Sequence, residues 1–207
     1  MTALVDKINF VREDRELYAP PADRFVEVDV PELGFLMIDG AGSPEGPGYA
    51  AAVQALYSLS YTVKFASKRQ LGRDYTVCPL EGLWWSERMD SFHDRAKDEW
   101  SWTMMIRQPG WVTPQHVDAA RAKAREKAPA VDRVRLDRYA EGLSVQIMHI
   151  GPYSAEAPTI ARLHDEYLPA HGLVETGHHH EIYVGDPRRS APEKLRTVLR
   201  QPVGRCR

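Results

Sequence analysis

The sequence has few cysteines and no strong excess of charge of either sign. Cys78 and Cys206 are its two thiols, too few for a disulfide framework. Its 27 Lys and Arg residues nearly balance its 29 Asp and Glu residues, so the formal net charge is −2. Such a balance provides no overall basic footprint for nucleic acid or for an anionic lipid surface. We therefore expect neither nucleic acid nor a membrane as a partner.

Long apolar runs and secretory signals are also missing. No apolar run approaches the roughly 18 residues that suggest a membrane-spanning helix, and the charged N-terminus has no signal-peptide core. Together with the sparse cysteines, this favours a cytoplasmic location. The chain of 207 residues is 43% hydrophobic and 27% charged, as is ordinary for one large globular domain or two small ones.

Common catalytic and metal-binding motifs are absent from the sequence as well. Gly40-Ala41-Gly42 lacks the following Lys-Ser/Thr of a phosphate-binding loop and is typical of a turn. The run 178–180 consists of three histidines, but no cysteine or HExxH-type spacing of a zinc protein supports it. We interpret these histidines as solvated residues at the start of a strand. We expect neither a metal nor a cofactor.

The order of predicted elements repeats along the chain. Each half contains a strand, then a helix with apolar side chains at i, i+3, i+4, i+7 and i+8, then two more strands. In the first half these elements span residues 35–38, 49–65, 74–85 and 100–107. In the second half they span residues 143–150, 157–170, 180–184 and 195–199. We therefore predict an α+β fold of two βαββ repeats, related by a pseudo-twofold axis, with a cleft between the repeats.

The repeats divide the chain into four parts. These are an N-terminal arm at 1–24, a first repeat at 25–110, a connecting helix at 111–130 and a second repeat at 131–207. The arm has strand-like residues at 9–11, and the first repeat begins with a strand or its lead-in at 25–30. The polar stretch 86–99 is predicted to be a hairpin loop. Thr113 and Pro114 open the charged connecting helix as N-cap and first helical residue.

Two glutamates stand out because each lies inside an apolar, aromatic strand. Alternate residues of a strand share a face, so Glu81 lies with Leu83 and Trp85, and Glu181 lies with Tyr183. A carboxylate among aromatic rings is unfavourable unless a cation balances its charge or it takes part in proton transfer. The alternative is that each strand lies at a sheet edge with its glutamate in solvent.

Aromatic side chains near these strands suggest walls for a flat ligand. Polar-tipped rings beside a carboxylate suit flat, cationic or polarised molecules, whereas core packing is the alternative for any single tryptophan. The candidate ligand-binding residues are Tyr57, Tyr61, Trp84, Trp85, Trp100, Trp102, His149 and Tyr183. The candidate catalytic residues are Glu181 as base, Tyr153 as proton donor ahead of Tyr61 and Tyr183, and Glu81 as the pseudo-symmetric alternative base.

Several motifs together resemble the stand-alone GyrI-like small-molecule-binding proteins over nearly the whole chain from about Val26. They are the stretches 35–40, 55–65, 79–85, 102–109, 145–153, 179–183 and 186–189. The resemblance implies a tandem βαββ fold of the SHS2 type, shared with the effector-binding domains of multidrug-sensing regulators. It implies that Glu181 meets lipophilic cations between aromatic walls. The helix-turn-helix of those regulators has no room in the arm, which argues against DNA binding.

Three functions stay open at this point. The first is a binding protein that sequesters hydrophobic, aromatic and often cationic drugs or other xenobiotics. The second, found in some stand-alone relatives, is a hydrolase that detoxifies strained cyclopropane-bearing natural products. In it Glu181 would activate water and a tyrosine would donate to the oxygen that gains charge. The third is a protein inhibitor of DNA gyrase, against which the near-neutral charge argues.

Overall fold

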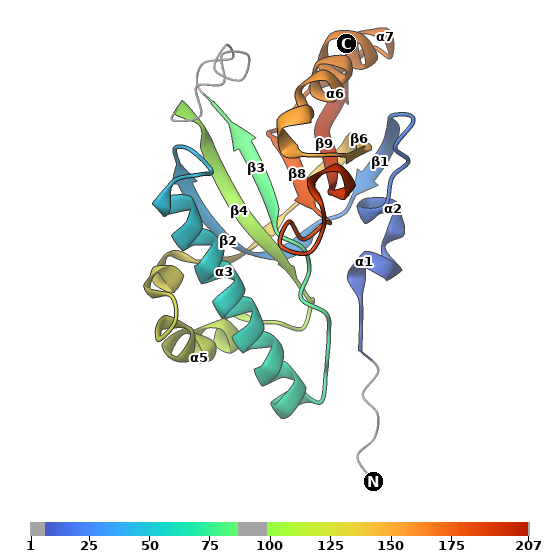
Figure 1. The fold of residues 1–207 in the computed structure, drawn as a ribbon. Helices are drawn as coiled ribbons and strands as arrows, with labels where there is room; N and C mark the ends of the chain where they lie inside the picture. The colour runs from blue at the N-terminus through green and yellow to red at the C-terminus, as the bar shows by residue number, and fades with distance from the viewer. Residues whose placement is uncertain (1–6, 87–98, 207) are drawn as a thin grey trace. The chain divides into compact units, whose positions relative to one another are not determined.

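The computed structural model describes residues 7–86 and 99–206, which fall into two compact units. One unit comprises Met1–Glu13 and Leu33–Tyr139, and the other comprises Asp14–Glu32 and Ala140–Arg207. Both contain a strand, a helical segment and two further strands in the predicted order, which confirms the α+β class (Figure 1). The superposition of the two repeats and the cleft between them stay predictions. So does the hairpin loop at 86–99, because residues 87–98 lie outside the described residues.

The first unit contains a four-stranded antiparallel sheet in the order β5–β2–β4–β3. Its strands are β2 (Leu33–Ala41), β3 (Glu81–Trp85), β4 (Ser101–Gln108) and β5 (Arg135–Tyr139). Helix α3 (Pro47–Ala66) runs across this sheet and buries Ala52, Leu56, Leu59 and Val63 (Figure 1). These side chains lie three or four residues apart, so they form the apolar stripe that the sheet covers.

Shorter elements complete the first unit. They are α1 (Phe10–Glu13), the π-helical turn η1 (Ser67–Leu71), α5 (Pro114–Arg125) and the 3-10 turn η3 (Pro129–Arg133). Helix α5 is the predicted connecting helix, with Thr113 as its N-cap. It packs against α3 and buries Val117, Ala120 and Ala124. Asp118, Lys123 and Arg125 of α5 are exposed, whereas the half-buried Arg121 donates to the carbonyls of Val131 and Val134.

Two strand predictions in this unit are wrong. Residues 9–11 are not strand-like, because α1 begins at Phe10 and the preceding Ile8 forms a single parallel bridge with Tyr75. The strand predicted at 74–85 begins instead at Glu81. Pro79 has no N–H to donate to a ladder, which is consistent with strand pairing beginning only beyond it.

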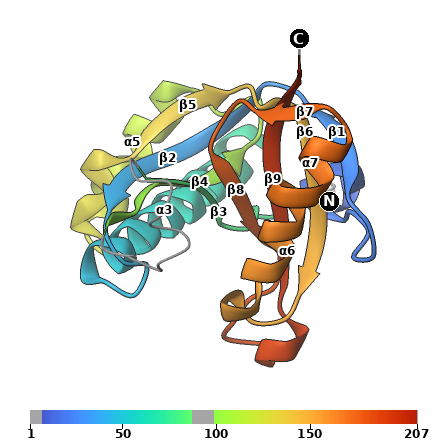
Figure 2. The same ribbon diagram turned by 90° about the horizontal axis from the view of Figure 1, so that it is seen from above.

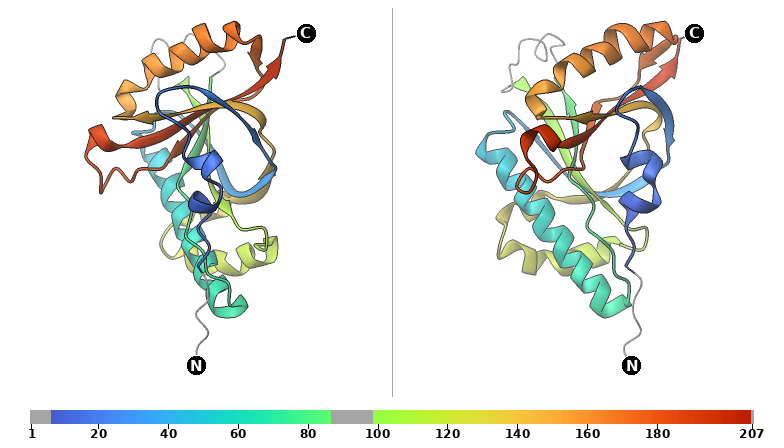
Figure 3. Two further views of the ribbon diagram at one scale, coloured as in Figure 1. Left: turned by 90° about the vertical axis from the view of Figure 1, so that its right-hand side faces the viewer. Right: turned by 45° about the vertical axis from the view of Figure 1, so that its right-hand side comes forward.

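The second unit contains an antiparallel sheet in the order β1–β6–β9–β8, with β7 paired to the end of β9. Its strands are β1 (Val26–Val30), β6 (Gly142–Ile150), β7 (Leu173–Glu175), β8 (His179–Tyr183) and β9 (Arg196–Arg205). A helical segment covers one sheet face (Figures 2 and 3). It consists of α6 (Ala157–Ala161), the π-helical η5 (Arg162–Tyr167) and α7 (Leu168–Ala170). Leu163 and Leu168 pack there against Val145 and Val203.

Each sheet includes one strand that lies, in the sequence, directly before a strand of the other sheet. β1 comes directly before β2 along the chain but pairs with β6, and β5 comes directly before β6 but pairs with β2. Arg135 of β5 donates to both carboxylate oxygens of Asp39 on β2, at 2.7 and 3.1 Å. The prediction that residues 25–30 open the first repeat thus differs from the observed pairing, because strand alternation specifies a two-faced strand but not its partner.

A buried polar network lies on the sheet face of the second unit opposite the helical segment. Glu141 Oε1 lies 2.9 Å from His180 Nδ1, and Arg200 donates to Glu141 Oε2 at 3.0 Å and to Gln146 Oε1 at 3.0 Å. Arg200 and Gln146 also donate to the carbonyls of Leu17 and Glu16, both at 2.6 Å. These carbonyls belong to α2 (Arg15–Tyr18), so the network fastens the N-terminal arm to β6 and β9.

The interpretation of the histidine run as solvated is wrong for His180, whose side chain is 1% exposed. Burial raises the pKa of Glu141, but the nearby charges of His180 and Arg200 and their hydrogen bonds outweigh it and lower that pKa to about 2. Charged partners that also form hydrogen bonds allow such a group to be buried as an anion. This is why an imidazole can occupy a core position here.

Gly40 allows Trp102 to pack flat on the sheet of the first unit. The two residues pair across β2 and β4, and a Cβ at position 40 would overlap the Trp102 ring. We expect Gly40→Ala to lower the free energy of unfolding by about 1–3 kcal/mol, the usual effect of overpacking. Urea unfolding measures it. The control is Gly48→Ala in α3, where a Cβ meets nothing within 4 Å, and which should be neutral or slightly stabilising. Equal effects of both changes would contradict this explanation.

Among the described residues, no helix is both long enough and apolar enough to cross a membrane.

Candidate functional site

A glutamate and two tyrosines come together at one end of the second sheet. Glu181 and Tyr183 share a face of β8, and the Tyr183 hydroxyl donates to Glu181 Oε2 at 2.8 Å. The Tyr153 ring packs edge-on against the Tyr183 ring, with 5.6 Å between centroids and 80° between planes. Tyr153 follows the Gly151-Pro152 turn and is 41% exposed. The Glu181 carboxylate therefore lies beside aromatic rings, as the sequence predicts.

The alternative that Glu181 and Glu81 lie in solvent is wrong. The side chain of Glu181 is 16% exposed, and Glu81 is 2% exposed. Glu81 pairs opposite Met105 of β4, on the same face as the buried Leu83 and the half-buried Trp85. Both glutamates are thus largely withdrawn from water, which is unfavourable for a carboxylate without compensating partners.

Two further side chains adjoin the Glu181 site across the sheet. Thr197 of β9 pairs opposite both Tyr183 of β8 and His149 of β6, so the three occupy one row of the face that carries Glu181. His149 is 8% exposed, and its Nε2 lies 3.4 Å from the Pro152 carbonyl oxygen, at the turn that leads to Tyr153. The register therefore brings the predicted ligand residue His149 close to the tyrosine pair.

Glu156 is a site residue that the sequence reasoning missed. It precedes α6, is 4% exposed, and its Oε1 has no hydrogen-bond partner in the described part of the chain. Burial and the negative charge of Glu181 raise the pKa of Glu156 to about 9, against a smaller opposing effect of the Thr197 hydroxyl. Nothing in the sequence marks it, because a glutamate before a helix is normally a solvated residue that interacts with the helix dipole.

His179 is the second residue that sequence reasoning did not single out for this site. Its Nε2 lies 3.6 Å from Glu181 Oε1, and its side chain is 12% exposed. Neither of its ring nitrogens has a hydrogen-bond partner among the residues that the structure describes. Its ring centroid lies 6.4 Å from that of His164, which contacts Glu175 at 2.6 Å. Glu181 thus has a phenol on one oxygen and an imidazole near the other.

The remaining predicted site residues lie in the first unit. Trp84 and Trp102 are buried, at 5% and 1% exposure, and both rings contact Tyr49. The Trp100 ring packs edge-on against Trp84. Core packing therefore explains Trp84 and Trp102, whereas the half-buried Trp85 and Trp100 keep some exposed surface.

Tyr57 and Tyr61 form an aromatic row on α3. Their rings stack with 6.3 Å between centroids, and Tyr61 stacks in the same way on Phe65 at 6.4 Å. Tyr61 and Phe65 are each 47% exposed. The row lies away from the buried stripe of the helix, which leaves it accessible. The assignment of all these residues to a ligand site stays a prediction.

A family model of the GyrI-like small molecule binding domain matches residues 25–203. This chain belongs to the GyrI-like family. An uncharacterized conserved protein from Listeria innocua shares 43% identity with it, over 96% of this chain and 100% of that one, with a TM-score of 0.87. Two further structures, each of a hydrolase from Listeria innocua, share 42% identity over the same fractions, with TM-scores of 0.82 and 0.85. No curated protein matched significantly.

A more distant likeness concerns the fold alone. The C-terminal domain of EcmrR shares 10% identity with the GyrI-like protein, over 88% of this chain and 98% of that one, with a TM-score of 0.56. The family is one of small-molecule-binding domains, which supports a small molecule as the ligand of this chain. Within residues 7–86 and 99–206, no three His, Cys, Asp or Glu side chains are grouped as metal ligands.

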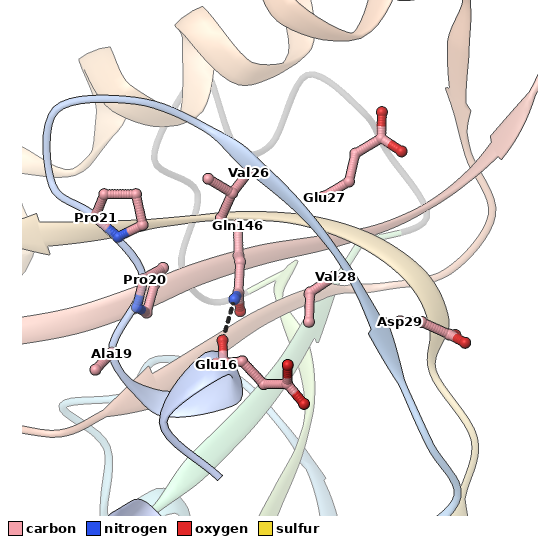
Figure 4. A pocket seen from close by; sticks show the side chains of 9 residues that line it. All are labelled: Glu16, Ala19, Pro20, Pro21, Val26, Glu27, Val28, Asp29 and Gln146. Atoms are coloured by element: carbon pink, nitrogen blue, oxygen red, sulfur yellow. Dashed lines mark hydrogen bonds between the residues drawn. The ribbon is translucent and has the colours of Figure 1, made fainter.

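A separate hollow of about 480 Å³ lies between the N-terminal arm and β1 of the GyrI-like protein (Figure 4). It is lined by Glu16, Ala19, Pro20, Pro21, Val26, Glu27, Val28, Asp29 and Gln146. The Gln146 amide donates a hydrogen bond to the Glu16 carbonyl across it, and Arg205 donates to Glu27 at 2.9 Å. The predicted aromatic walls and catalytic residues do not line this hollow.

Proposed function

We propose that this GyrI-like protein is a hydrolase that adds water to small, hydrophobic, strained electrophiles. The observation that carries the proposal is the Glu181 carboxylate, mostly withdrawn from water and held at 2.8 Å by the Tyr183 hydroxyl, beside the exposed Tyr153 ring. A desolvated, oriented carboxylate is a suitable general base. The identity of 42% with hydrolases that the chain covers completely supports the same reaction class.

The reaction proposed for a cyclopropane fused to a conjugated carbonyl needs one base and one donor. Glu181 takes a proton from water as its oxygen attacks a ring carbon. The ring C–C bond breaks, and its electron pair moves through the conjugated system onto the carbonyl oxygen. Tyr153 donates a proton to that oxygen and recovers one from Glu181 through solvent, so the net change is the addition of one water. Edge and face contacts with Tyr153 and Tyr183 would hold a flat substrate.

Tyr153→Phe tests the donor. We expect its turnover of spirocyclopropane-containing compounds to fall on the order of a hundredfold, the usual effect of removing a donor to a developing oxyanion. Mass spectrometry of the ring-opened hydrate gives the rate. Tyr167→Phe is the matched control, because Tyr167 stacks on His171 away from Glu181, and should keep the wild-type rate. If wild type shows no rate above buffer across a panel of such compounds, the hydrolase proposal fails.

A second candidate function is sequestration of aromatic cations without turnover. The same Glu181 charge beside two tyrosine rings favours it, since ring faces and a carboxylate both attract a cation. Micromolar dissociation constants, about −8 kcal/mol, would be ordinary for such a site. Recovery of unchanged ligand after tight binding would favour sequestration over hydrolysis.

A further inference from the structure

Glu156 has a buried carboxyl group that the proposed hydrolysis does not use. It is 4% exposed, and within the described ranges its Oε1 has no hydrogen-bond partner. An ionised carboxylate in that setting would lose most of its hydration without compensation. Among the described residues, the charge that acts on it is the negative charge of Glu181. Its burial is therefore best explained by a neutral, protonated form.

The groups around Glu156 come from every element of the site. Glu181 acts on it from β8, where its partner Tyr183 also lies, and Thr197 acts on it from β9. His149 of β6 lies next to Thr197, and Tyr153 lies in the turn just before Glu156. Of these, Glu181 acts on Glu156 through its negative charge, and the Thr197 hydroxyl has a smaller opposing effect. Two neighbouring carboxyls in a poorly solvated site do not both ionise readily.

We propose that Glu156 and Glu181 work as one unit that holds a single proton, with the buried Glu156 keeping the proton and Glu181 carrying the charge that faces the ligand. This role rests on the proposed function of the Glu181 site. Glu156 is a positioning residue in it, because it acts through Glu181. At neutral pH the pair then has one negative charge, which suits a neutral electrophile or a monocation rather than a dication.

The shared proton also explains how Glu181 becomes ionised again after each turnover. When Glu181 takes a proton from water, its negative charge disappears, together with the repulsion that opposes ionisation of Glu156. The pair then holds two protons and releases one through solvent to Tyr153, which has donated its own proton to the substrate oxygen. It returns to the single-proton state with Glu181 ionised. Loss of the one remaining proton at high pH would leave two carboxylates that repel each other.

The test is a pH titration of the full chain, without ligand, labelled with ¹³C at the glutamate carboxyls and followed by NMR. Wild type should show one glutamate carboxyl that stays protonated at pH 7 and titrates at about 9. Glu156→Gln should remove that signal. Glu181→Gln should move it to lower pH, because the charge of Glu181 is gone while burial remains. The control Glu193→Gln, at an exposed glutamate of the same unit, should change neither.

Two outcomes would overturn the proposal. One is a wild-type protein in which every glutamate carboxyl is ionised at pH 7, or whose protonated signal survives Glu156→Gln. The other is a midpoint that Glu181→Gln leaves in place, which would show that the carboxyls do not share the proton. The measurement needs no substrate. A protein that fails to hydrolyse any test compound can therefore still pass it, and the two proposals fail separately.

Stability provides a second readout of a protonated Glu156. Between the pKa of an unfolded glutamate and the raised pKa in the folded chain, the folded state holds a proton that the unfolded state has lost. The contribution of Glu156 to stability is therefore lost as pH rises from about 4.5 to about 9. The stability of Glu156→Gln relative to wild type should increase with pH across this range. A difference that does not change with pH would contradict a protonated Glu156, on which the shared proton depends.

Discussion

Replacing Glu181 with glutamine is expected to lower the rate of hydrolysis on the order of a hundredfold or more, the usual effect of losing a general base. Glutamine keeps the shape of the side chain and can still accept a hydrogen bond from Tyr183, which lies 2.8 Å from the carboxylate. The change thus removes the charge and the ability to take a proton while leaving the packing in place. Hydrate formation, measured by mass spectrometry at saturating substrate, gives the loss in kcat.

Glu81→Gln is the matched control for this experiment. Glu81 is the glutamate of the first unit that the sequence predicts to be equivalent to Glu181, and it is buried in its own sheet. If Glu181 is the base, Glu81→Gln should keep a rate near that of wild type. A rate that survives Glu181→Gln but falls with Glu81→Gln would place the base in the first unit. For sequestration without turnover, Glu181→Gln should instead weaken binding of a cationic dye and leave a neutral analogue of the same shape unaffected.

Replacing Arg200 with methionine should destabilise the protein by about 3–5 kcal/mol, the usual result of removing one partner of a buried ion pair. Arg200 is 3% exposed at its side chain and Glu141 is 1% exposed. Without the guanidinium, the Glu141 carboxylate would keep His180 as its remaining partner in this network. The carbonyls of Leu17 and Glu16 would also be affected, because Arg200 binds the first directly and orients Gln146 toward the second.

Urea unfolding at pH 7 measures the effect, with Arg205→Met as the control. Arg205 lies on the same strand, β9, but its side chain is 60% exposed in its ion pair with Glu27. Exposed ion pairs of this kind contribute about 0–1 kcal/mol. A loss no larger for Arg200→Met than for Arg205→Met would mean that the network adds little to stability. Proteolysis of the arm should increase with Arg200→Met, because the network fastens α2.

The order and type of the main elements of each repeat could be predicted from the sequence, whereas α1 lies where a strand was expected and β5 and β7 were not predicted. Helix α3 and the helical segment at 157–170 appear where apolar side chains recur with helical spacing. The placement of Glu81 with Leu83 and Trp85, and of Glu181 with Tyr183, follows from alternation within a strand. These are local properties, decided by residues within one turn or one strand of each other, so a single sequence contains the necessary information.

Pairing partners and burial were decided by tertiary structure alone. Val26–Val30 and Arg135–Tyr139 each pair with a strand of the other repeat, although each is adjacent in sequence to a strand of its own. Alternation of apolar and polar residues specifies two faces but no neighbour. Likewise, the helical spacing of Tyr61 allows it a place on the buried stripe, yet it is 47% exposed.

Glu156 shows most clearly what the sequence could not reveal. By itself it is one acidic residue before a short helix, a setting that favours solvation and interaction with the helix dipole. Glu156 is buried and interacts with Glu181 because the helical segment at 157–170 packs over one face of the second sheet, which includes β8 and β9. The sequence alone determined which residue types lie on each face of a strand. The tertiary structure decided which of these side chains are buried together, away from water. That loss of water, which depends on distant segments meeting, determines where a carboxyl keeps its proton.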